Sequence, residues 1–444
     1  MSTLPAAAGH PADPGAPPPP PGGFRAFMVA WLPSLLVVIA TGGCLFSLSW
    51  WINGAPGGGA SLGLVIGGSS VVSLTVTTVL SGVLDRADRL RALTVLLLVL
   101  ALPVAALVVL FGGTGHGTAA LIAAAVCYTA ISTTETLYLA ATETVTADLA
   151  PASWPETRTA LLTQIHSQVD RVVAPAAAGA VIAAGALRSV PVTALAVLLA
   201  MLLVLRWGRR PLDAVTARLR AEADPAAPAA GNPLRTWLRD AASAVALIRA
   251  HRDLVFLVRL GVLGNLIVFP FYAVLPAFLT AYVSSPRENA TVYGQAAAAY
   301  GLGMLVGTVV LLRAGRRLSG RRALAVASGA LAAICGVVLA VSLTTSPGAV
   351  VAGLTLTGLL FSVLVAVGGA VWLRRTPAEI RVRVFSLRRL TVFSSIPVGT
   401  ALLGVGGAAF GYREFVRGVV LVVLVALAWS WLAARRHLTD DAPA

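Results

Sequence analysis

The sequence predicts an all-α polytopic membrane protein with twelve transmembrane helices in two pseudo-symmetric six-helix bundles. Hydrophobic residues make up 57% of the 444 residues and charged residues only 11%, well below the roughly 25% of soluble proteins. The mean hydropathy is +0.86. Lipid offers no partner to an unpaired backbone amide, and the apolar runs far exceed the roughly 10-residue strands of a membrane barrel, so helices are expected.

Twelve runs have the length of about 20 mostly apolar residues that a helix needs to cross about 30 Å of hydrocarbon. In chain order they cover 26–51, 61–84, 92–112, 118–142, 159–185, 191–207, 254–283, 291–312, 323–343, 349–373, 384–410 and 415–434.

Arginine predicts the orientation. With both termini in the cytoplasm, the inside segments hold 25 arginines and the outside loops hold four, namely Arg188, Arg287, Arg413 and Arg417. This excess follows the positive-inside rule. The Arg-, Ala- and Gly-rich composition is typical of a high-GC bacterial source, for which we expect a multi-pass protein of the plasma (inner) membrane.

The same composition excludes several classes of function. All 33 basic residues are Arg, which excludes the phosphate-binding Lys of a P-loop and a Schiff-base Lys. The three cysteines lie in separate apolar runs, so we expect no metal site and no redox cofactor. The net charge of +15 comes from arginine clusters between spans, and we expect no nucleic-acid partner.

Two hydrophilic segments divide the chain. Residues 1–25 form a Pro-rich cytoplasmic tail without a cleavable signal, which is expected to be disordered. Residues 208–253 link two six-span bundles, 26–207 and 254–435, and 436–444 form a second tail. The linker's second half has apolar residues at helical spacing, which favours a helix on the cytoplasmic leaflet over a solvated linker; they are Leu234, Trp237, Leu238, Ala241, Val245 and Ile248.

A repeated proline pattern supports duplication of the two halves. Pro155 and Pro377 begin spans 5 and 11, and each is followed 20 residues later by an internal proline. Small residues follow both internal prolines, so we expect helix-bend motifs there; they comprise Pro175, Gly179, Pro397 and Gly399. Prolines in Ala-rich sequence could also coincide by chance.

The loop between spans 2 and 3 reads Ser-Gly-Val-Leu-Asp-Arg-Ala-Asp-Arg-Leu-Arg from Ser81. It resembles the G-x-L-x-D-R-x-G-R-R loop of the major facilitator superfamily, although Ser81 and Asp88 replace that pattern's glycines. The resemblance implies a conformational latch formed by Asp85, Arg86 and Arg89. The alternative is that these charges only mark the inside boundary. Residues 171–179 also partly resemble the Gly-Pro-x-x-Gly-Gly segment of proton-driven exporters in that superfamily. This second resemblance implies export.

Each charged side chain inside the hydrocarbon costs at least about 2.5 to 3.5 kcal/mol, so such a residue is a candidate for a functional role. Glu135 on span 4 and Asp170 on span 5 are predicted to meet near midmembrane. Polar residues at helical spacing accompany them and predict a wet seam, namely Tyr128, Ser132 and Thr142 on span 4 with Gln164, Gln168 and Arg171 on span 5.

We expect Glu135 or Asp170 to carry a coupling proton, with Arg171 as its electrostatic partner and His166 as a relay. An acid beside a guanidinium stays ionised until geometry separates the two groups, and low dielectric then favours its protonated form. The alternatives are a permanent Glu135–Arg171 ion pair that locks spans 4 and 5, or a cytoplasmic vestibule without coupling.

The second half has no deep acid. Span 7 places Asn265, Phe269 and Tyr272 on one stripe, which suits a partly apolar organic substrate. Three further arginines are expected to snorkel to the cytoplasmic face, namely Arg259, Arg388 and Arg389.

These features predict a secondary transporter of small organic molecules that works by alternating access, most simply a proton-coupled exporter. A proton-coupled importer is the first alternative. A membrane-embedded enzyme is disfavoured because the spans lack clusters of catalytic or metal-binding residues. A membrane scaffold that does not transport is the last alternative. The expected partners are a small-molecule substrate, the proton and the lipid bilayer, and we expect a monomer.

Overall fold

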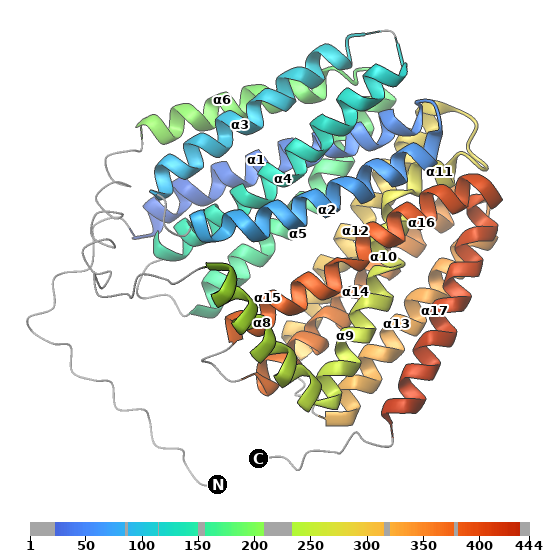
Figure 1. Cartoon of the computed structure of the whole chain (residues 1–444). Coiled ribbons are helices and arrows are strands. Elements are labelled where there is room, and N and C mark those ends of the chain that lie inside the picture. The colour runs from blue at the N-terminus through green and yellow to red at the C-terminus, as the bar shows by residue number, and fades with distance from the viewer. Residues whose placement is uncertain are drawn as a thin grey trace, which may run out of the picture.

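The protein is described here from a computed structural model that covers residues 23–84, 88–113, 115–149, 156–207, 233–314, 320–376 and 381–435. The described residues are mostly helical, and Figure 1 shows the helices as two neighbouring bundles. The first bundle contains α1 (Gly23–Asn53), α2 (Gly58–Leu84), α3 (Arg89–Leu110), α4 (Thr118–Leu149), α5 (Glu156–Ala183) and α6 (Ser189–Trp207). The rest of the chain forms α8 (Pro233–Ala250), α9 (Arg252–Asn265), α10 (Val268–Ala273), α11 (Leu275–Leu279), α12 (Pro286–Ala314), α13 (Gly320–Leu343), α14 (Pro347–Arg375), α15 (Arg381–Phe393), α16 (Ser395–Phe410) and α17 (Tyr412–Ala434).

Eleven segments of the described chain are long and apolar enough to cross a membrane. The twelfth predicted span is α5, whose 28 residues give a length of about 42 Å at 1.5 Å per residue. Its polar residues, Gln168, Asp170 and Arg171 among them, make it less apolar than the other eleven. The predicted all-α polytopic fold is therefore confirmed, and its most polar span lies between the bundles, packed on α1 and α12.

The buried apolar residues form two clusters. One draws only on residues between Phe27 and Leu205. The other runs mainly from Ala244 to Leu427 and also includes Phe46, Ala178 and Ile182 of the first half. Each half thus has its own core, and a small number of residues join the cores. The residue limits that we assigned to the halves, linker and tails stay predictions.

Two predicted spans are broken rather than continuous. Span 7 is divided into α9, α10 and α11, and span 11 into α15 and α16. The cause is proline, which lacks a backbone N–H and whose ring clashes with the carbonyl four residues earlier. Pro270 and Pro397 each follow a break by a few residues. By contrast, α5 continues through Pro175 without interruption.

The halves meet through glycines. A methyl group at Gly179 of α5 would lie 2.7 Å from the Cα atom of Gly294 on α12. At the second contact, a methyl group at Gly63 of α2 would lie 2.6 Å from the Cα atom of Gly404 on α16. Backbone therefore packs on backbone at both places, as small residues permit between membrane helices.

The paired prolines lie at these same contacts. The carbonyl oxygen of Pro175 is 3.0 Å from the Cβ position of Gly294, and that of Pro397 is 2.9 Å from the Cβ position of Gly67. The predicted helix-bend residues thus contact the opposite half in an equivalent way. Gly399 differs, because it packs within its own half against Leu266 and Pro270.

Helix α8 packs on protein. Figure 1 shows it crossing the end of the second bundle beside α15 and α9. Its described apolar residues Ala244, Leu247 and Ile248 join the second core cluster. These three side chains cover the end of the second bundle. The side chains of Leu234, Trp237, Leu238 and Ala241 lie outside the described residues, and the predicted position of this helix on the cytoplasmic leaflet stays a prediction.

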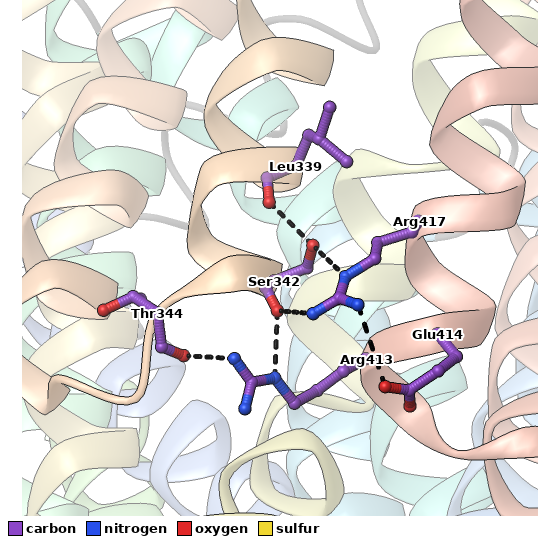
Figure 2. Close-up of polar contacts among 6 residues, drawn as sticks. All are labelled: Leu339, Ser342, Thr344, Arg413, Glu414 and Arg417. Carbon is purple, nitrogen blue, oxygen red and sulfur yellow. Dashed lines mark hydrogen bonds and ion pairs between the residues drawn. The ribbon is translucent and has the colours of Figure 1, made fainter.

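Two of the arginines that we predicted in the outside loops bind carbonyl oxygens at the C-terminal end of α13 (Figure 2). The carbonyl oxygen of Ser342 accepts hydrogen bonds from Arg413 Nε at 2.9 Å and from Arg417 Nη2 at 2.8 Å. Arg413 Nη2 also donates to the carbonyl of Thr344 at 3.0 Å. The last carbonyls of a helix have no partner within it and carry partial negative charge, so these arginines stabilise the end of α13 against α17.

We expect Arg417→Ala to lower the thermal unfolding midpoint of the purified protein by several degrees. The variant loses charge-assisted hydrogen bonds that are each worth about 1.5–3 kcal/mol. Arg287→Ala, at an exposed arginine on the same predicted side, is the matched control. Equal midpoints for the two variants would show that the contacts of Arg417 are not stabilising.

Candidate functional site

The two acids predicted at midmembrane lie together inside the first half. Glu135 of α4 is 8% exposed, and its carboxyl interacts with Asp170 of α5 and with the Thr41 side chain of α1. The Oδ1 atom of Asp170 is 2.6 Å from the Cβ position of Gly42 on α1. A glycine at that position makes room for the carboxyl, which is therefore directed into its own half.

Several buried polar atoms on the two helices that carry the acids have no hydrogen-bond partner within the described chain. They include Asp170 Oδ1 and Gln168 Oε1 on α5, together with the Thr133 hydroxyl on α4. Burying such groups unpaired costs free energy, and exceptions of this kind cluster where water, an ion or a ligand is expected. The α4–α5 region therefore contains buried polar atoms without partners, while the predicted wet seam stays a prediction.

Arg171 does not pair with the acids. No ion pair joins it to Glu135 or Asp170, although all three side chains are described. The guanidinium instead points to the second half, where its Nη1 atom donates to the Met304 sulfur at 3.5 Å and its Cζ atom lies 5.8 Å from the Phe269 ring centre. The alternative of a permanent Glu135–Arg171 ion pair is therefore not found in this conformation.

The geometry of α5 explains this separation. Successive residues of a helix point about 100° apart, so Asp170 and Arg171 face different neighbours. The backbone carbonyl of Arg171 lies 2.6 Å from the Cβ position of Gly301 on α12, which places the Arg171 backbone against the second half. As a result, α5 directs its acid into one half and its guanidinium into the other.

An aromatic cluster in the second half surrounds the guanidinium. The rings of Phe269 and Phe361 meet edge to face at 5.5 Å, those of Tyr272 and Tyr300 lie 5.5 Å apart, and those of Tyr300 and Phe361 lie 6.5 Å apart. Both tyrosines interact electrostatically with Arg171. We call these four residues the aromatic cluster.

The sequence prediction found two members of this cluster and missed the other two. Phe269 and Tyr272 were identified from their stripe on span 7. Tyr300 lies in a run of Ala and Gly on α12, and Phe361 lies in a Leu- and Val-rich part of α14, where helical spacing alone gives no reason to choose them. A tyrosine flanked by small residues on both sides was the available signal.

Other predicted site residues have structural roles. Asn265 is buried, and its amide nitrogen donates to the Val392 carbonyl at 3.0 Å. That bond ties the broken spans 7 and 11 together, so this side chain is not a simple cavity lining. Ser132 donates to the Thr129 carbonyl of its own helix at 3.3 Å. Tyr128 interacts with Ser49 and Glu135 and thus borders the acids.

Part of the predicted site falls outside what is described. This applies to Asp85 and Arg86 of the latch, and to the side chains of Arg89, Gln164 and His166. At the start of α3, the backbone N–H of Arg91 donates to Asp88 Oδ1 at 3.1 Å. Asp88, which departs from the superfamily pattern, therefore caps that helix.

The remaining span arginines lie at the predicted cytoplasmic end. Arg388 lies over the rings of Trp372 and Phe385, at 5.3 and 5.6 Å. Arg389 lies 5.8 Å from the Phe393 ring and interacts with Glu143 of the first half. Arg259 is exposed.

Comparison with known proteins identifies the fold. No protein-family model matches the chain, and no curated protein sequence matches it. Among solved structures, the nucleoside transporter NupG is similar with a TM-score of 0.67 and 14% identity over 93% of this chain and 100% of that chain.

Two further structures show the same likeness. A bacterial homologue of the human lysosomal transporter Spinster, inward-facing and occupied, has a TM-score of 0.65 and 14% identity over 94% of this chain and 98% of that one. A POT family transporter in complex with 5-aminolevulinic acid has a TM-score of 0.66 and 11% identity over 94% and 98% of the two chains. The chain therefore shares the fold of these transporters over nearly its whole length.

Proposed function

We propose that this protein is a secondary active transporter of the major facilitator type, which moves small, partly apolar organic molecules by alternating access and couples their export to proton entry. The observation that carries the proposal is the arrangement around α5. Buried Glu135 and half-buried Asp170 lie on one side of the helix, and a guanidinium among aromatic rings lies on the other, where two similar halves meet.

The broken helices support transport. In secondary transporters, substrate and ion sites lie near midmembrane where the repeats meet, typically beside discontinuous helices. Here the breaks between α9 and α10 and between α15 and α16 are joined by the Asn265–Val392 hydrogen bond. Phe269 follows the first break directly and contacts Arg171.

The glycine contacts support alternating access. Gly63–Gly404 and Gly179–Gly294 join the halves at two equivalent places, and both pairs lie toward the side that we predict to face outward. Backbone contacts between membrane helices depend on van der Waals packing and small residues, which permits the halves to separate as rigid bodies. The solved transporters of this fold include one in an inward-facing conformation.

Proton coupling is proposed from the acids, and export from the segment around Pro175. Ionisable residues inside the membrane are costly and commonly mark substrate, ion or proton paths. Pro175 and Gly179 pack against α12, as expected for a segment that resembles the proline motif of proton-driven exporters. We place the protein in the plasma membrane with both termini cytoplasmic, as the arginine distribution predicts.

Proteoliposomes with an imposed pH gradient test the function. We expect the full chain to move a solute from a panel of small organic compounds against the direction of proton flow, and to stop when the gradient is collapsed. Movement of solute and proton in the same direction would establish the importer alternative instead. Flux equal to that of empty vesicles across the whole panel would contradict the transport proposal.

A further inference from the structure

We propose that the transported molecule is an organic monocarboxylate with a planar, aromatic body, whose carboxylate is bound by Arg171 and whose ring packs on the aromatic cluster. This inference rests on the proposed transport function and specifies the class of substrate. It follows from the position of Arg171, which is the charged group that faces the second half, and from the aromatic cluster around it.

The guanidinium is short of partners. Arginine carries several N–H donors in a rigid planar fork, yet among the described residues one hydrogen bond is formed, to the weakly accepting sulfur of Met304. The contact with Phe269 adds a cation–π interaction, which is weaker than a charge-assisted hydrogen bond. A half-buried cation with these neighbours is suited to an anion supplied by the substrate.

Two buried polar groups beside Arg171 also lack partners. The Tyr300 hydroxyl and Gln168 Oε1 make no hydrogen bond within the described chain, and both residues are 3% exposed. Gln168 lies three residues before Arg171 and so on the same side of α5. The Tyr300 hydroxyl can donate to a second carboxylate oxygen, and Gln168 Oε1 can accept from a polar group on the substrate.

The charge at the site favours an anion over a cation. Asp170 interacts electrostatically with Arg171 and Tyr272, but among the described residues it forms no ion pair with Arg171 and its Oδ1 atom packs against Gly42 of α1. Glu135 is almost fully buried in the first half. A substrate ammonium would meet Arg171 first and be repelled. Among the described residues, Arg171 is the charged group that lies over a ring of the aromatic cluster, and its planar fork can bind both oxygens of a carboxylate.

The ring surface favours a planar body. Phe269 and Tyr272 are half-buried, whereas Tyr300 and Phe361 behind them are buried. Aromatic pairs prefer offset-stacked or edge-to-face geometries with centres about 4.5–7 Å apart. The Phe269–Phe361 pair already meets edge to face, and the tilted Tyr272–Tyr300 pair has its ring centres within this range, so an incoming ring can pack against preorganised neighbours.

Three probes with one body and different head groups test the inference. They are 3-phenylpropionate, 3-phenylpropylamine and 3-phenylpropan-1-ol, and binding is measured by calorimetry on the full chain in lipid nanodiscs at pH 7. We expect the carboxylate to bind at least tenfold more tightly than the amine and the alcohol. Empty nanodiscs correct for partition of the amine into lipid. Equal binding of the three probes, or tighter binding of the amine, would overturn the inference.

Variants of Arg171 assign the preference to its side chain. Arg171→Gln should weaken carboxylate binding about ten- to a hundredfold, as expected for the loss of a charge-assisted interaction. Arg171→Lys should recover only part of it, because the charge remains but the planar fork is lost. Arg188→Gln, at an exposed arginine of an outer loop, is the control and should bind as the natural chain does. A carboxylate preference that survives in Arg171→Gln would also overturn the inference.

The two proposals fail differently. If the protein carries a neutral or cationic solute in proteoliposomes and Arg171→Gln carries it equally well, transport stands and the carboxylate assignment is wrong. If no solute moves under either pH gradient, the transport proposal fails, whatever the nanodiscs bind. Uptake of 3-phenylpropionate that is lost in Arg171→Gln and kept in Arg188→Gln supports both.

Discussion

Glu135→Gln is expected to abolish solute movement driven by a pH gradient while the protein still exchanges solute across vesicles without one. Glutamine keeps the size and most of the hydrogen-bonding capacity of the side chain but cannot bind or release a proton. Glu135 is buried and interacts with Asp170 and Thr41. If its carboxyl carries the coupling proton, the variant is fixed in one charge state and only coupling is lost.

Glu143→Gln is the matched control for this prediction. Glu143 lies eight residues further along the same helix, but its side chain is exposed and it interacts electrostatically with Arg389 of the second half. The control should keep at least half of the gradient-driven flux. Both variants should elute as a single folded species, and counterflow of labelled solute provides the readout that does not require the gradient.

The outcomes separate three roles for the acids. Loss of driven flux with retained counterflow assigns the proton to Glu135. Loss of both activities in a folded protein would indicate that Glu135 maintains the structure of the site. Full driven flux in Glu135→Gln would exclude it as the carrier, and Asp170→Asn would then be the variant expected to separate the two activities.

The fold could be predicted from the sequence because the bilayer imposes one strong constraint. Every span must form its backbone hydrogen bonds within a helix and must cover about 30 Å of hydrocarbon. Long apolar runs therefore reveal the number of spans and their order in the chain. A bend was expected at Pro397 of span 11, next to the break between α15 and α16, whereas the breaks in span 7 near Pro270 were not predicted. Proline breaks one helix and is tolerated in another, as Pro175 is in α5, and packing against neighbours decides between these outcomes.

The candidate site was predictable only in part for a similar reason. Helical spacing on α4 and α5 correctly placed Glu135 and Asp170 together, since both residues belong to adjacent helices of one half. Spacing gives the direction of a side chain relative to its own helix and does not show which helix lies opposite. Arg171 was therefore assigned to the acids, whereas the close approach of Gly301 turns it toward the aromatic cluster.

Gly63→Ala is expected to reduce transport at least tenfold, whereas Gly68→Ala on the same helix should have little effect. A methyl group at Gly63 would lie 2.6 Å from the Cα atom of Gly404 and 2.7 Å from the Thr400 carbonyl oxygen. Both are backbone atoms that cannot rotate away. At Gly68, nothing lies within 4 Å of the new methyl group, so that variant controls for the change in helix propensity.

The expected cause of the loss is a shift in the balance between conformations. Overpacking costs about 1–3 kcal/mol, and this penalty applies only while α2 and α16 are in contact. The conformation described here is therefore disfavoured about 5- to 150-fold relative to one in which these helices are separated. Because every cycle must return to the closed contact, turnover falls.

A thiol reporter at this contact distinguishes the shift from simple unfolding. Thr400 is fully buried here, and the three natural cysteines are buried as well, so Thr400→Cys gives a low labelling background. A membrane-impermeant maleimide should label this cysteine several times faster in Gly63→Ala than in Gly68→Ala, while both proteins keep similar unfolding midpoints. If the two variants show the same labelling rate and the same flux, the α2–α16 contact does not open during transport. A contact that opens in each cycle must also form again, and the methyl group at Gly63 hinders its formation.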